Sequence, residues 1–506
     1  MKWIVNSEEM NACDSNTIRH FKVPAIVLME RAALCFVDEV VKNVPSGRIL
    51  AVCGNGNNGA DGLAAVRLLY QRGYQVTAVQ VPDNGKRTKE NQLQRDILAQ
   101  YGIHILEQLP KEMHFDCVAD ALFGVGLSRE PKGIYAEWIS YMNACSGLKA
   151  AIDMPSGVSS DDGTAYDPAF AADITVTFAY QKAGQVLYPG CRYCGDIITA
   201  EIGITDQSWL GVKPSCFTLE PSDLKQLPYR HPRGNKGTFG HVLAVAGSRQ
   251  MAGAALFCAK AAYCTGCGLV KIYTAESNRQ ILQSTLPEAI LTVYDDEAPQ
   301  EANERQSLAE ALKWADAVIL GPGIGQSEQA QRMATQVLSD AAVPVIADAD
   351  ALNLLAGNLH LLQAMTAPLV ITPHLGEMAR LCGRNIKQIQ SSLRQTAEQF
   401  AKSYQLTCVL KDAVTVTAGT CGTSLNTSGC SAMAKGGSGD VLAGMIAGLA
   451  AQGMDPEHAA HMGVYLHGLA GSLAARRKGS YSVLARDIID AIGAVMEPET
   501  LTDGRG

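Results

Sequence analysis

The sequence predicts a protein of two α/β domains, each built around a parallel, doubly wound sheet. The chain has 506 residues, which exceeds the roughly 250–300 residues at which one hydrophobic core usually stops growing. Short β-rich runs alternate with longer amphipathic stretches, and this alternation lapses once and then restarts. Strands separated by helix-length segments indicate right-handed crossover connections and therefore parallel sheets.

The first domain is expected to contain six strands in succession. The β-rich runs that mark them lie at residues 48–54, 74–81, 115–124, 148–157, 172–179 and 195–203. From about residue 206 to 240 the pattern gives way to proline, glycine and polar residues, which is typical of a domain boundary. We therefore expect a first domain at 1–210, a linker at 211–230 and a second domain at 231–506.

The second domain repeats the alternation without repeating the motifs of the first. Its β-rich runs lie at residues 241–248, 268–274, 315–325, 343–355, 367–377 and 406–418. In open α/β sheets, ligands bind outside the carboxyl ends of the strands. The residues that follow the strands of both domains are rich in glycine and acidic side chains. Two unlike domains of this kind indicate two unlike sites.

Composition and charge exclude several classes of protein. Hydrophobic residues make up 47% of the chain and charged residues 18%, which is typical of a globular protein. The net charge of −8 offers no basic surface for nucleic acid. The opening stretch has too few apolar residues for a signal peptide, and no apolar run is long enough to span a membrane, so we expect a cytoplasmic location. The pairs Cys191/Cys194 and Cys264/Cys267 have Cys-x-x-Cys spacing, but packing is favoured over metal or redox use.

Residues 433–453 place several glycines, in the stretch GGSGD, directly before a helix-like run of small residues. Glycines allow a close approach of backbone to ligand, and the first turn of a helix offers unpaired N–H groups, so this stretch suits an anion such as phosphate. Asp440 ends the stretch, and a carboxylate beside a phosphate suggests a base that deprotonates the attacking hydroxyl. The alternative is a structural one, in which Asp440 caps the helix and Gly444 and Gly448 permit close helix packing. No G-x-x-x-x-G-K-[ST] motif occurs in the chain.

Seven motifs in order across the second domain resemble the ADP- or ATP-dependent NAD(P)H-hydrate dehydratases, a ribokinase-like family. They lie at residues 235–248, 251–270, 321–325, 348–353, 372–377, 411–415 and 434–444. The resemblance implies removal of water from the S epimer of a hydrated nicotinamide cofactor at the expense of a nucleotide phosphate. It implies that Asp440 deprotonates the hydroxyl of the hydrate. It also implies that the amides of Gly437, Ser438 and Gly439 stabilise the phosphoryl group.

The same resemblance implies two sets of binding residues in the second domain. Ala254, Gly323, His374 and Asp440 would contact the hydrate. The nucleotide would be contacted by Lys411, Asp412, Ala413, Val414, Thr415, Gly437, Ser438 and Gly439. Phosphoryl transfer implies Mg²⁺, for which Asp348 and Glu377 are acidic candidates. We expect ADP as the donor because of the fused domain order, although no residue distinguishes ADP from ATP. Leu375 stands where proline or another residue is expected in the family, and Asp412 stands where glycine is usual.

Polar side chains follow three strands of the first domain. Gly54, Gly56 and Gly59 have the G-x-G-x-x-G spacing of a dinucleotide-binding turn, with Asp83 after the next strand, so a redox dehydrogenase is a competing interpretation. The asparagines of this turn and Asp61 make it more polar than a pyrophosphate turn requires. Two later strand ends carry the polar residues Asp120, Asp153 and Ser156. Together these oxygens suit either a hard cation or ordinary helix caps.

Three motifs of the first domain, GNGNNGADGL, DALFGVGLSRE and IDMPSGV, resemble the NAD(P)H-hydrate epimerases over about residues 10–205. The resemblance implies a Rossmann-like, three-layer αβα domain and a potassium ion held by Asn58, Asp120 and Ser156. It implies that the hydrate is bound by Asn57, Asn58, Gly59, Ala60, Asp61, Gly124, Val125, Gly126, Leu127, Ser128, Arg129, Glu130, Tyr135 and Asp153. Ala60 replaces a usual glycine.

Epimerisation requires the hydroxyl-bearing carbon to become planar and then to accept oxygen from the other face. Asp153 follows a strand and lies close to Ser156 in the sequence, so it is our candidate acid–base group. The chain is therefore predicted to be a bifunctional repair enzyme that acts on the hydrates NADHX and NADPHX, with no preference between them readable from the residues.

Two other functions stay open at the level of sequence. A small-molecule kinase would use the same anion site and aspartate, but it would release a stable phosphorylated product. A non-catalytic dinucleotide sensor would bind the hydrate through the first domain without converting it. For the predicted enzyme we expect K⁺, Mg²⁺ and ADP as cofactors or donor, a homo-oligomeric state, and no nucleic-acid or membrane partner.

Overall fold

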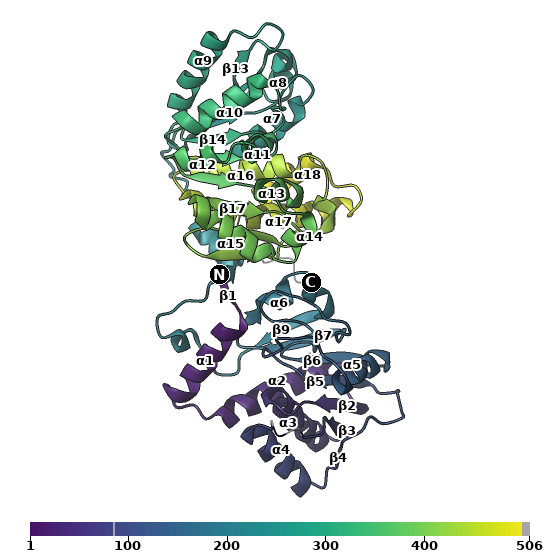
Figure 1. The fold of residues 1–506 in the computed structure, drawn as a ribbon. Helices are drawn as coiled ribbons and strands as arrows, with labels where there is room; N and C mark the ends of the chain where they lie inside the picture. Colours follow the sequence, from purple (N-terminus) through teal and green to yellow (C-terminus); the bar gives the residue numbers. More distant parts are fainter. Residues whose placement is uncertain (84, 86, 498–506) are drawn as a thin grey trace. The chain divides into compact units, whose positions relative to one another are not determined.

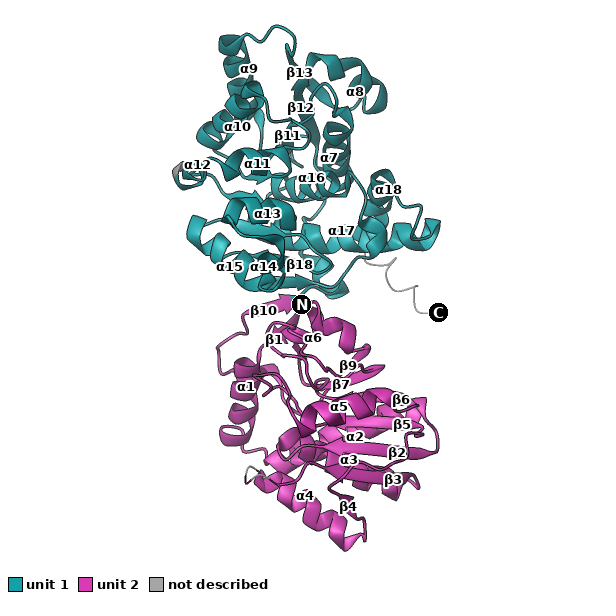
Figure 2. Cartoon of the chain, turned by 45° about the vertical axis from the view of Figure 1, so that its right-hand side comes forward, with its two compact units in different colours: residues 1, 218–506 teal, residues 2–217 magenta. Residues whose placement is uncertain are grey.

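The computed structural model describes residues 1–83, 85 and 87–497. The chain divides into two compact units, drawn in magenta and teal in Figure 2. The N-terminal unit comprises Lys2–Phe217, and the C-terminal unit comprises Thr218–Gly506 together with Met1. The last nine residues of the predicted second domain, 498–506, lie outside the described residues. The two-domain α/β architecture predicted from the sequence is confirmed.

The N-terminal unit contains a fully parallel sheet of seven strands in the order β4-β3-β2-β5-β6-β7-β9 (Figure 1). Its strands are β2 (Arg48–Cys53), β3 (Gln75–Gln80), β4 (Ile105–Leu106), β5 (Cys117–Ala121), β6 (Leu148–Ile152), β7 (Ile174–Phe178) and β9 (Asp196–Ala200). Six of them match the predicted strands, and the two-residue β4 is an addition at the edge. Outside this sheet, β1 (Lys2–Val5) pairs in parallel with β8 (Gln181–Lys182).

Helices cover both faces of this sheet. The helices are α1 (Ser7–Arg19), α2 (Ala25–Asn43), α3 (Asn57–Gln71), α4 (Lys89–Gln100), α5 (Ile134–Ala144) and α6 (Ala183–Val186). Successive side chains of a strand point to opposite faces, so Ile49 and Ala51 of β2 join a core with α2 and α3. Leu50 of the same strand joins a second core with Trp138 of α5. The unit therefore has the expected three layers.

The C-terminal unit contains a larger sheet that includes the order β13-β12-β11-β14-β15-β16-β17-β18-β19 (Figure 1). Its strands are β11 (His241–Val245), β12 (Leu269–Ala275), β13 (Ile290–Tyr294), β14 (Ala317–Leu320), β15 (Val345–Ala347), β16 (Leu369–Ile371), β17 (Thr407–Leu410), β18 (Thr415–Ala418) and β19 (Thr423–Asn426). The strands from β13 to β17 are parallel, whereas β17, β18 and β19 pair antiparallel.

The prediction of one strand for the β-rich run at 406–418 is wrong. Residues 411–414 leave the sheet and reverse the chain, so the segment forms β17 and β18 on either side of a turn. The strands β13 and β19 did not stand out in the sequence. One reason is that β13 lies at an edge, where its side chains are mostly half-buried and its pattern is weak.

Helix α16 (Ser438–Ala451) is buried along nearly its whole length and packs against α7 (Ala252–Cys264). A side chain on Gly444 would collide with the carbonyl oxygen of Cys258, and one on Gly448 would lie 2.8 Å from that of Ala262. The other helices are α8 (Arg279–Thr285), α9 (Glu301–Trp314), α10 (Glu328–Asp340), α11 (Asp350–Ala356), α12 (His360–Ala364), α13 (Leu375–Cys382), α14 (Ile386–Gln390), α15 (Leu393–Tyr404), α17 (Pro456–Lys478) and α18 (Ala485–Met496). The close packing fixes the position of the first turn of α16.

Among the described residues, no helix is long and apolar enough to cross a membrane. No group of three or more His, Cys, Asp and Glu side chains in that part of the chain is arranged to hold a metal ion. The cysteines are free thiols, and Cys194 and Cys267 of the two Cys-x-x-Cys pairs are buried.

Candidate active sites

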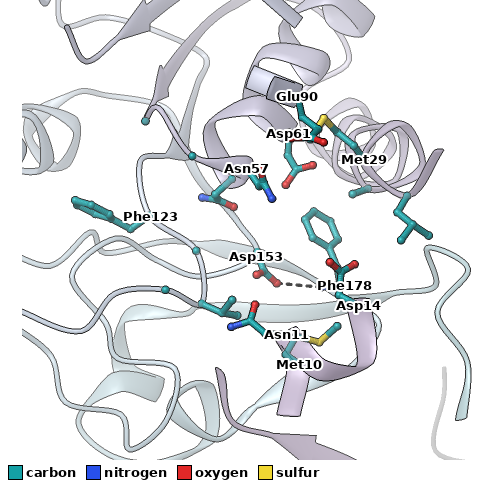
Figure 3. Close-up of a pocket in the computed structure, with 18 of the residues that line it drawn as sticks. Met10, Asn11, Asp14, Met29, Asn57, Asp61, Glu90, Phe123, Asp153 and Phe178 are labelled. Atoms are coloured by element: carbon teal, nitrogen blue, oxygen red, sulfur yellow. Dashed lines mark hydrogen bonds between the residues drawn. The ribbon is translucent and has the colours of Figure 1, made fainter. Parts of the chain in front are cut away.

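The N-terminal unit contains a pocket of about 480 Å³ next to the carboxyl ends of β2, β5 and β6 (Figure 3). Several of the predicted hydrate-binding residues line it: Asn57, Asn58, Asp61, Gly124, Val125, Gly126, Leu127, Tyr135 and Asp153. The others do not: Gly59, Ala60, Ser128, Arg129 and Glu130. Helix α1 adds side chains to the wall that no motif indicated, among them Asn11 and Asp14.

The three glycines of the G-x-G-x-x-G turn have different reasons to be glycine. A side chain on Gly54 would collide with the carbonyl oxygen of Leu122, and one on Gly59 would collide with that of Gly54. Only Gly56, which precedes α3, has open space beside it. The fully buried Asn91 donates hydrogen bonds of 3.1 Å to the carbonyl oxygens of Gly54 and Gly56. The close packing within the turn therefore explains the glycine spacing without a bound pyrophosphate.

Asp120 and Ser156 form a buried, hydrogen-bonded pair at neighbouring strand ends. The Ser156 hydroxyl and backbone N–H each donate to the Asp120 carboxylate over 2.7 Å. The Phe123 backbone N–H donates in turn to the Ser156 hydroxyl over 3.0 Å. Both side chains are completely buried, and burial raises the pKa of Asp120 to about 6. No hydrogen bond or ion pair within the described residues brings a cationic side chain to this carboxylate.

Asn58 has buried polar atoms with no partner. Neither its amide nitrogen nor its side-chain oxygen makes a hydrogen bond to a described residue. A Cβ on Gly124, four residues beyond Asp120, would lie 3.3 Å from that oxygen, so glycine leaves the space beside it open. A buried amide oxygen without a partner and a buried carboxylate are both ligands that a hard cation prefers. The predicted potassium ligands Asn58, Asp120 and Ser156 therefore suit such an ion chemically.

The Asp153 carboxylate is contacted by several donors. The Lys182 ammonium contacts its carboxylate, and the Thr177 hydroxyl and Phe178 backbone N–H donate to the same oxygen over 3.2 and 3.3 Å. Lys182 is only 1% exposed. Asp153 has a positive φ of 63°, and a hydrogen bond of 2.7 Å from Gln185 to its carbonyl oxygen helps to hold this strained backbone. Sequence reasoning missed Lys182, whose only signal was a lysine within a largely apolar run.

Two further carboxyl groups, Asp14 and Asp61, share this pocket with Asp153 (Figure 3). Burial, followed by the charges of Asp153 and Asp14, raises the pKa of Asp61 well above its usual value. Burial and then the charge of Asp153 also raise the pKa of Asp14. These three acids and Glu90 line one pocket together with Lys182, which Asp153 already engages.

In the C-terminal unit, Asp440 lies in the first turn of α16, as the GGSGD stretch predicted. Gly437 precedes this helix with a φ of 91°, and a Cβ there would lie 2.8 Å from the Phe257 ring. The Ser438 hydroxyl donates to the carbonyl oxygen of Met433 over 2.8 Å, and its backbone N–H makes a long bond of 3.3 Å to that of Lys435. Amides of such a first turn have no partner within the helix, so they are available to an anion.

A buried ion pair lies against this turn. Lys411 follows β17 and donates to Asp348, which follows β15, over 2.8 Å. Thr372 donates to the same carboxylate oxygen over 2.6 Å. A Cβ on Gly439 would lie 3.2 Å from the Lys411 ammonium, so only a residue without a side chain leaves this space open to a ligand. Burial, then the charge of Asp348, raises the pKa of Asp440 to about 7, and Lys411 opposes the rise.

His374 and Glu377 begin α13 as a reciprocal cap. The His374 Nδ1 atom accepts from the backbone N–H groups of Gly376 and Glu377 over 2.9 and 3.3 Å, while Glu377 accepts from the His374 N–H over 2.9 Å. Burial and Lys411 lower the pKa of His374, so its ring is neutral with the proton on Nε2. Burial raises the pKa of Glu377 to about 7. The histidine thus caps α13, and its Nε2 atom lies 3.3 Å from a carboxylate oxygen of Glu377.

The remaining predicted residues lie at two places: where Gly323 approaches Ala254, and in the turn at 411–415. A Cβ on Gly323 would lie 2.9 Å from that of Ala254, so the structure brings these two together. Asp350 holds their loop by accepting from the Gly325 N–H over 2.9 Å. Residues 411–415 form the turn between β17 and β18, and of these Lys411 reaches the Asp348 carboxylate.

Both units match known protein families. Residues 242–494 match the family model of NAD(P)H-hydrate dehydratase, and residues 25–184 match that of the YjeF-related protein N-terminus. The chain is 36% identical to the bifunctional NAD(P)H-hydrate repair enzyme Nnr of Moorella thermoacetica, over 98% of this chain and 96% of that relative. It is 34% identical to the same-named enzyme of Thermofilum pendens, over 94% and 93%. A crystal structure of a ribokinase-like superfamily protein from Enterococcus faecalis is similar with a TM-score of 0.50 and 30% identity, covering 56% of this chain and 95% of that chain.

Proposed function

The chain belongs to the family of bifunctional NAD(P)H-hydrate repair enzymes, and from this premise we propose how its two units divide the reaction. The N-terminal unit interconverts the R and S hydrates. The C-terminal unit phosphorylates the hydroxyl of the S hydrate and expels phosphate, which restores the nicotinamide ring. The main support for this division is the position of Asp440. This partly buried base lies in the first turn of a helix that follows a glycine, beside the Lys411–Asp348 pair.

In the C-terminal unit, Asp440 takes the proton from the hydroxyl that attacks the terminal phosphate of the nucleotide. The amides of Gly437, Ser438 and Gly439 hold the transferring oxygens, and the Lys411 ammonium offsets their charge. Ala254, Gly323 and His374 contact the hydrate. The turn at 411–415 contacts the nucleotide, with ADP giving AMP and phosphate.

Magnesium, when bound, would neutralise charge on the phosphates. The carboxylates of Asp348 and Glu377 suit it chemically, and a magnesium ion of this kind takes most of its other ligands from phosphate and water. A cytoplasmic location and a homo-oligomeric state also stay predictions from the sequence.

In the N-terminal unit, Asn58, Asp120 and Ser156 would hold potassium, which when bound would give the buried Asp120 carboxylate its counter-charge. Hydrate would enter the pocket lined by Asn57, Asp61, Gly124–Leu127, Tyr135 and Asp153. Asp153 exchanges a proton with the reacting hydroxyl or with water. The predicted domain limits, 1–210 and 231–506, assign the two activities to separate segments.

One incubation tests the proposed function. The purified chain is supplied with a mixture of both hydrate epimers, Mg²⁺, K⁺ and either ADP or ATP, and absorbance reports restored NADH or NADPH. Full conversion of the mixture with one phosphate released per cofactor supports both activities. Accumulation of a stable phosphorylated product would indicate a kinase, and a residue of unconverted R hydrate would contradict epimerisation.

The dehydratase reaction should depend on pH through Asp440. A base acts when deprotonated, and the pKa of Asp440 is raised to about 7, so kcat/KM should fall about tenfold per pH unit below pH 7 and level off above it. The charge of Asp350 contributes to that rise. Asp350→Asn keeps an oxygen for the Gly325 N–H, and we expect it to move the acid limb to lower pH. A profile without this limb, or an upward move in the variant, would exclude Asp440 as the base.

The potassium site should be measurable through stability as well as rate. A ligand that binds only the folded state stabilises it, by about 1.4 kcal/mol at ten times its Kd, which corresponds to a rise in Tm of about 3–6 °C for a unit of this size. We expect KCl to raise the Tm of the N-terminal unit above its value in N-methylglucamine chloride of equal ionic strength. Asp120→Asn should abolish this difference, and scanning calorimetry of the full chain measures it. Equal Tm values in the two salts would refute the site.

A further inference from the structure

The pocket of the N-terminal unit carries an unusual balance of charge. Its ionisable lining residues are Asp14 on α1, Asp61 on α3, Glu90 on α4, Asp153 after β6 and Lys182 on β8. The lysine is nearly fully buried and engaged by Asp153. A negative pocket of about 480 Å³ is of a size for a ligand ring, and it favours a positively charged ring over a phosphate.

Asp61 and Asp153 approach this space from different elements and have opposite surroundings. Asp153 accepts hydrogen bonds from Lys182, Thr177 and Phe178 at one carboxylate oxygen. Asp61 receives no hydrogen bond from a described side chain, and its neighbours Asp14 and Asp153 are acids, so it favours the protonated form. Figure 3 shows Asp61 directed into the pocket from α3, while Asp153 lies across it. Pairs of acids that are driven apart in this way commonly divide the roles of acid and base.

Resting on the epimerase function proposed above, we propose that Asp61 and Asp153 act as an acid–base pair on opposite faces of the hydrated carbon. The reaction then passes through a planar, cationic nicotinamide ring. Asp61 is thereby assigned a catalytic role in addition to binding.

Protonated Asp61 gives its proton to the hydroxyl, the carbon–oxygen bond breaks with its electron pair on oxygen, and water leaves. The lone pair of the ring nitrogen forms a C=N⁺ bond at the same time. A water molecule then attacks the planar carbon from the other face, the C=N⁺ electrons return to nitrogen, and Asp153 accepts the proton of that water. Asp61 ends ionised and Asp153 protonated, which is the state that converts the opposite epimer.

The negative charge of the surrounding acids would stabilise the cationic ring in this scheme. A cationic ring is most stable next to fixed negative charge in a site that largely excludes water. Burial and the charge of Asp153 raise the pKa of Asp61, and the charge of Asp14 on α1 adds to the rise. Asp14 is therefore expected to act on the pH range of the reaction.

The test follows R-to-S conversion by the full chain in H₂¹⁸O without nucleotide, so that dehydration cannot proceed. Chromatography measures the epimers, and mass spectrometry measures their oxygen isotope. We expect one ¹⁸O to enter each inverted molecule. Asp61→Asn should lower kcat by about 100-fold or more with little change in KM. Inversion without ¹⁸O, or Asp61→Asn within threefold of the unaltered chain, would overturn the proposal.

Matched variants separate a chemical role from a structural one. Asp14→Asn removes a neighbouring charge, so it should move the high-pH limb, where Asp61 loses its proton, to lower pH. Glu90→Gln, also in the pocket wall, should leave this limb where it is. Nucleotide-dependent dehydration of S hydrate by the same chains controls for concentration and folding. If the unaltered chain fails to interconvert epimers, the proposed function itself is wrong; if only the Asp61 result fails, the acid–base pair alone is wrong.

Discussion

Asp440→Asn should reduce the dehydratase kcat by about 10²–10⁴-fold, the range typical of removing a general base. Asparagine has almost the same shape as aspartate, so the close packing of α16 on α7 should persist. The first-turn amides and Lys411 remain in place, and nucleotide should bind with similar affinity. What disappears is the group whose pKa of about 7 lets it accept a proton at neutral pH.

The measurement is recovery of NADH from purified S hydrate, together with hydrate-dependent release of phosphate. Asp490→Asn is the matched control, because Asp490 lies on α18 of the same unit and pairs at the surface with Lys260 over 3.3 Å. This control should keep full activity. R-to-S conversion by Asp440→Asn should be unchanged, since that reaction belongs to the other unit. A kcat within threefold of normal would show that another group removes the proton.

Contiguous motifs made the first turn of α16 and the turn at 54–59 readable from the sequence. In each, the glycines and the polar residue lie within one turn of chain, so their spacing alone predicts that they meet. The strand-end position of Asp120, Asp153 and Asp348 also followed from the alternation of strands and helices. These positions gave the architecture and most of the polar residues near each site.

The partners of those residues could not be predicted in the same way. Lys411 is 63 residues from Asp348, and Lys182 is 29 residues from Asp153, so only the folded chain brings them together. Asp14 reaches the pocket because α1 packs beside the sheet, and a single aspartate on an amphipathic helix carries no local signal. The protonation of Asp61 likewise depends on acids from other elements. Electrostatic character is a property of the assembled site.

Lys182→Met should destabilise the N-terminal unit by about 3–5 kcal/mol, because breaking a buried ion pair leaves an uncompensated buried charge. Lys182 is 1% and Asp153 13% exposed, so water can replace the ammonium only in part. Hydrogen exchange in increasing urea, read by mass spectrometry, follows the amides of this unit separately from those of the other. Arg48→Met, which breaks the exposed pair with Glu112, should leave the transition nearly unchanged.

The double variant Asp153→Asn with Lys182→Met separates the two contributions of this pair. Removing both charges eliminates the buried carboxylate, so most of the lost stability should return, as it does when buried ion pairs are replaced by neutral groups. Epimerisation should stay absent, because the restored fold still has no anion at position 153 to accept the proton of water. If the double variant were as unstable as Lys182→Met alone, the lysine would be needed for packing through its apolar stem. If it epimerised at the normal rate, the pair would have no part in the chemistry, and Asp61 would lack the partner assigned to it.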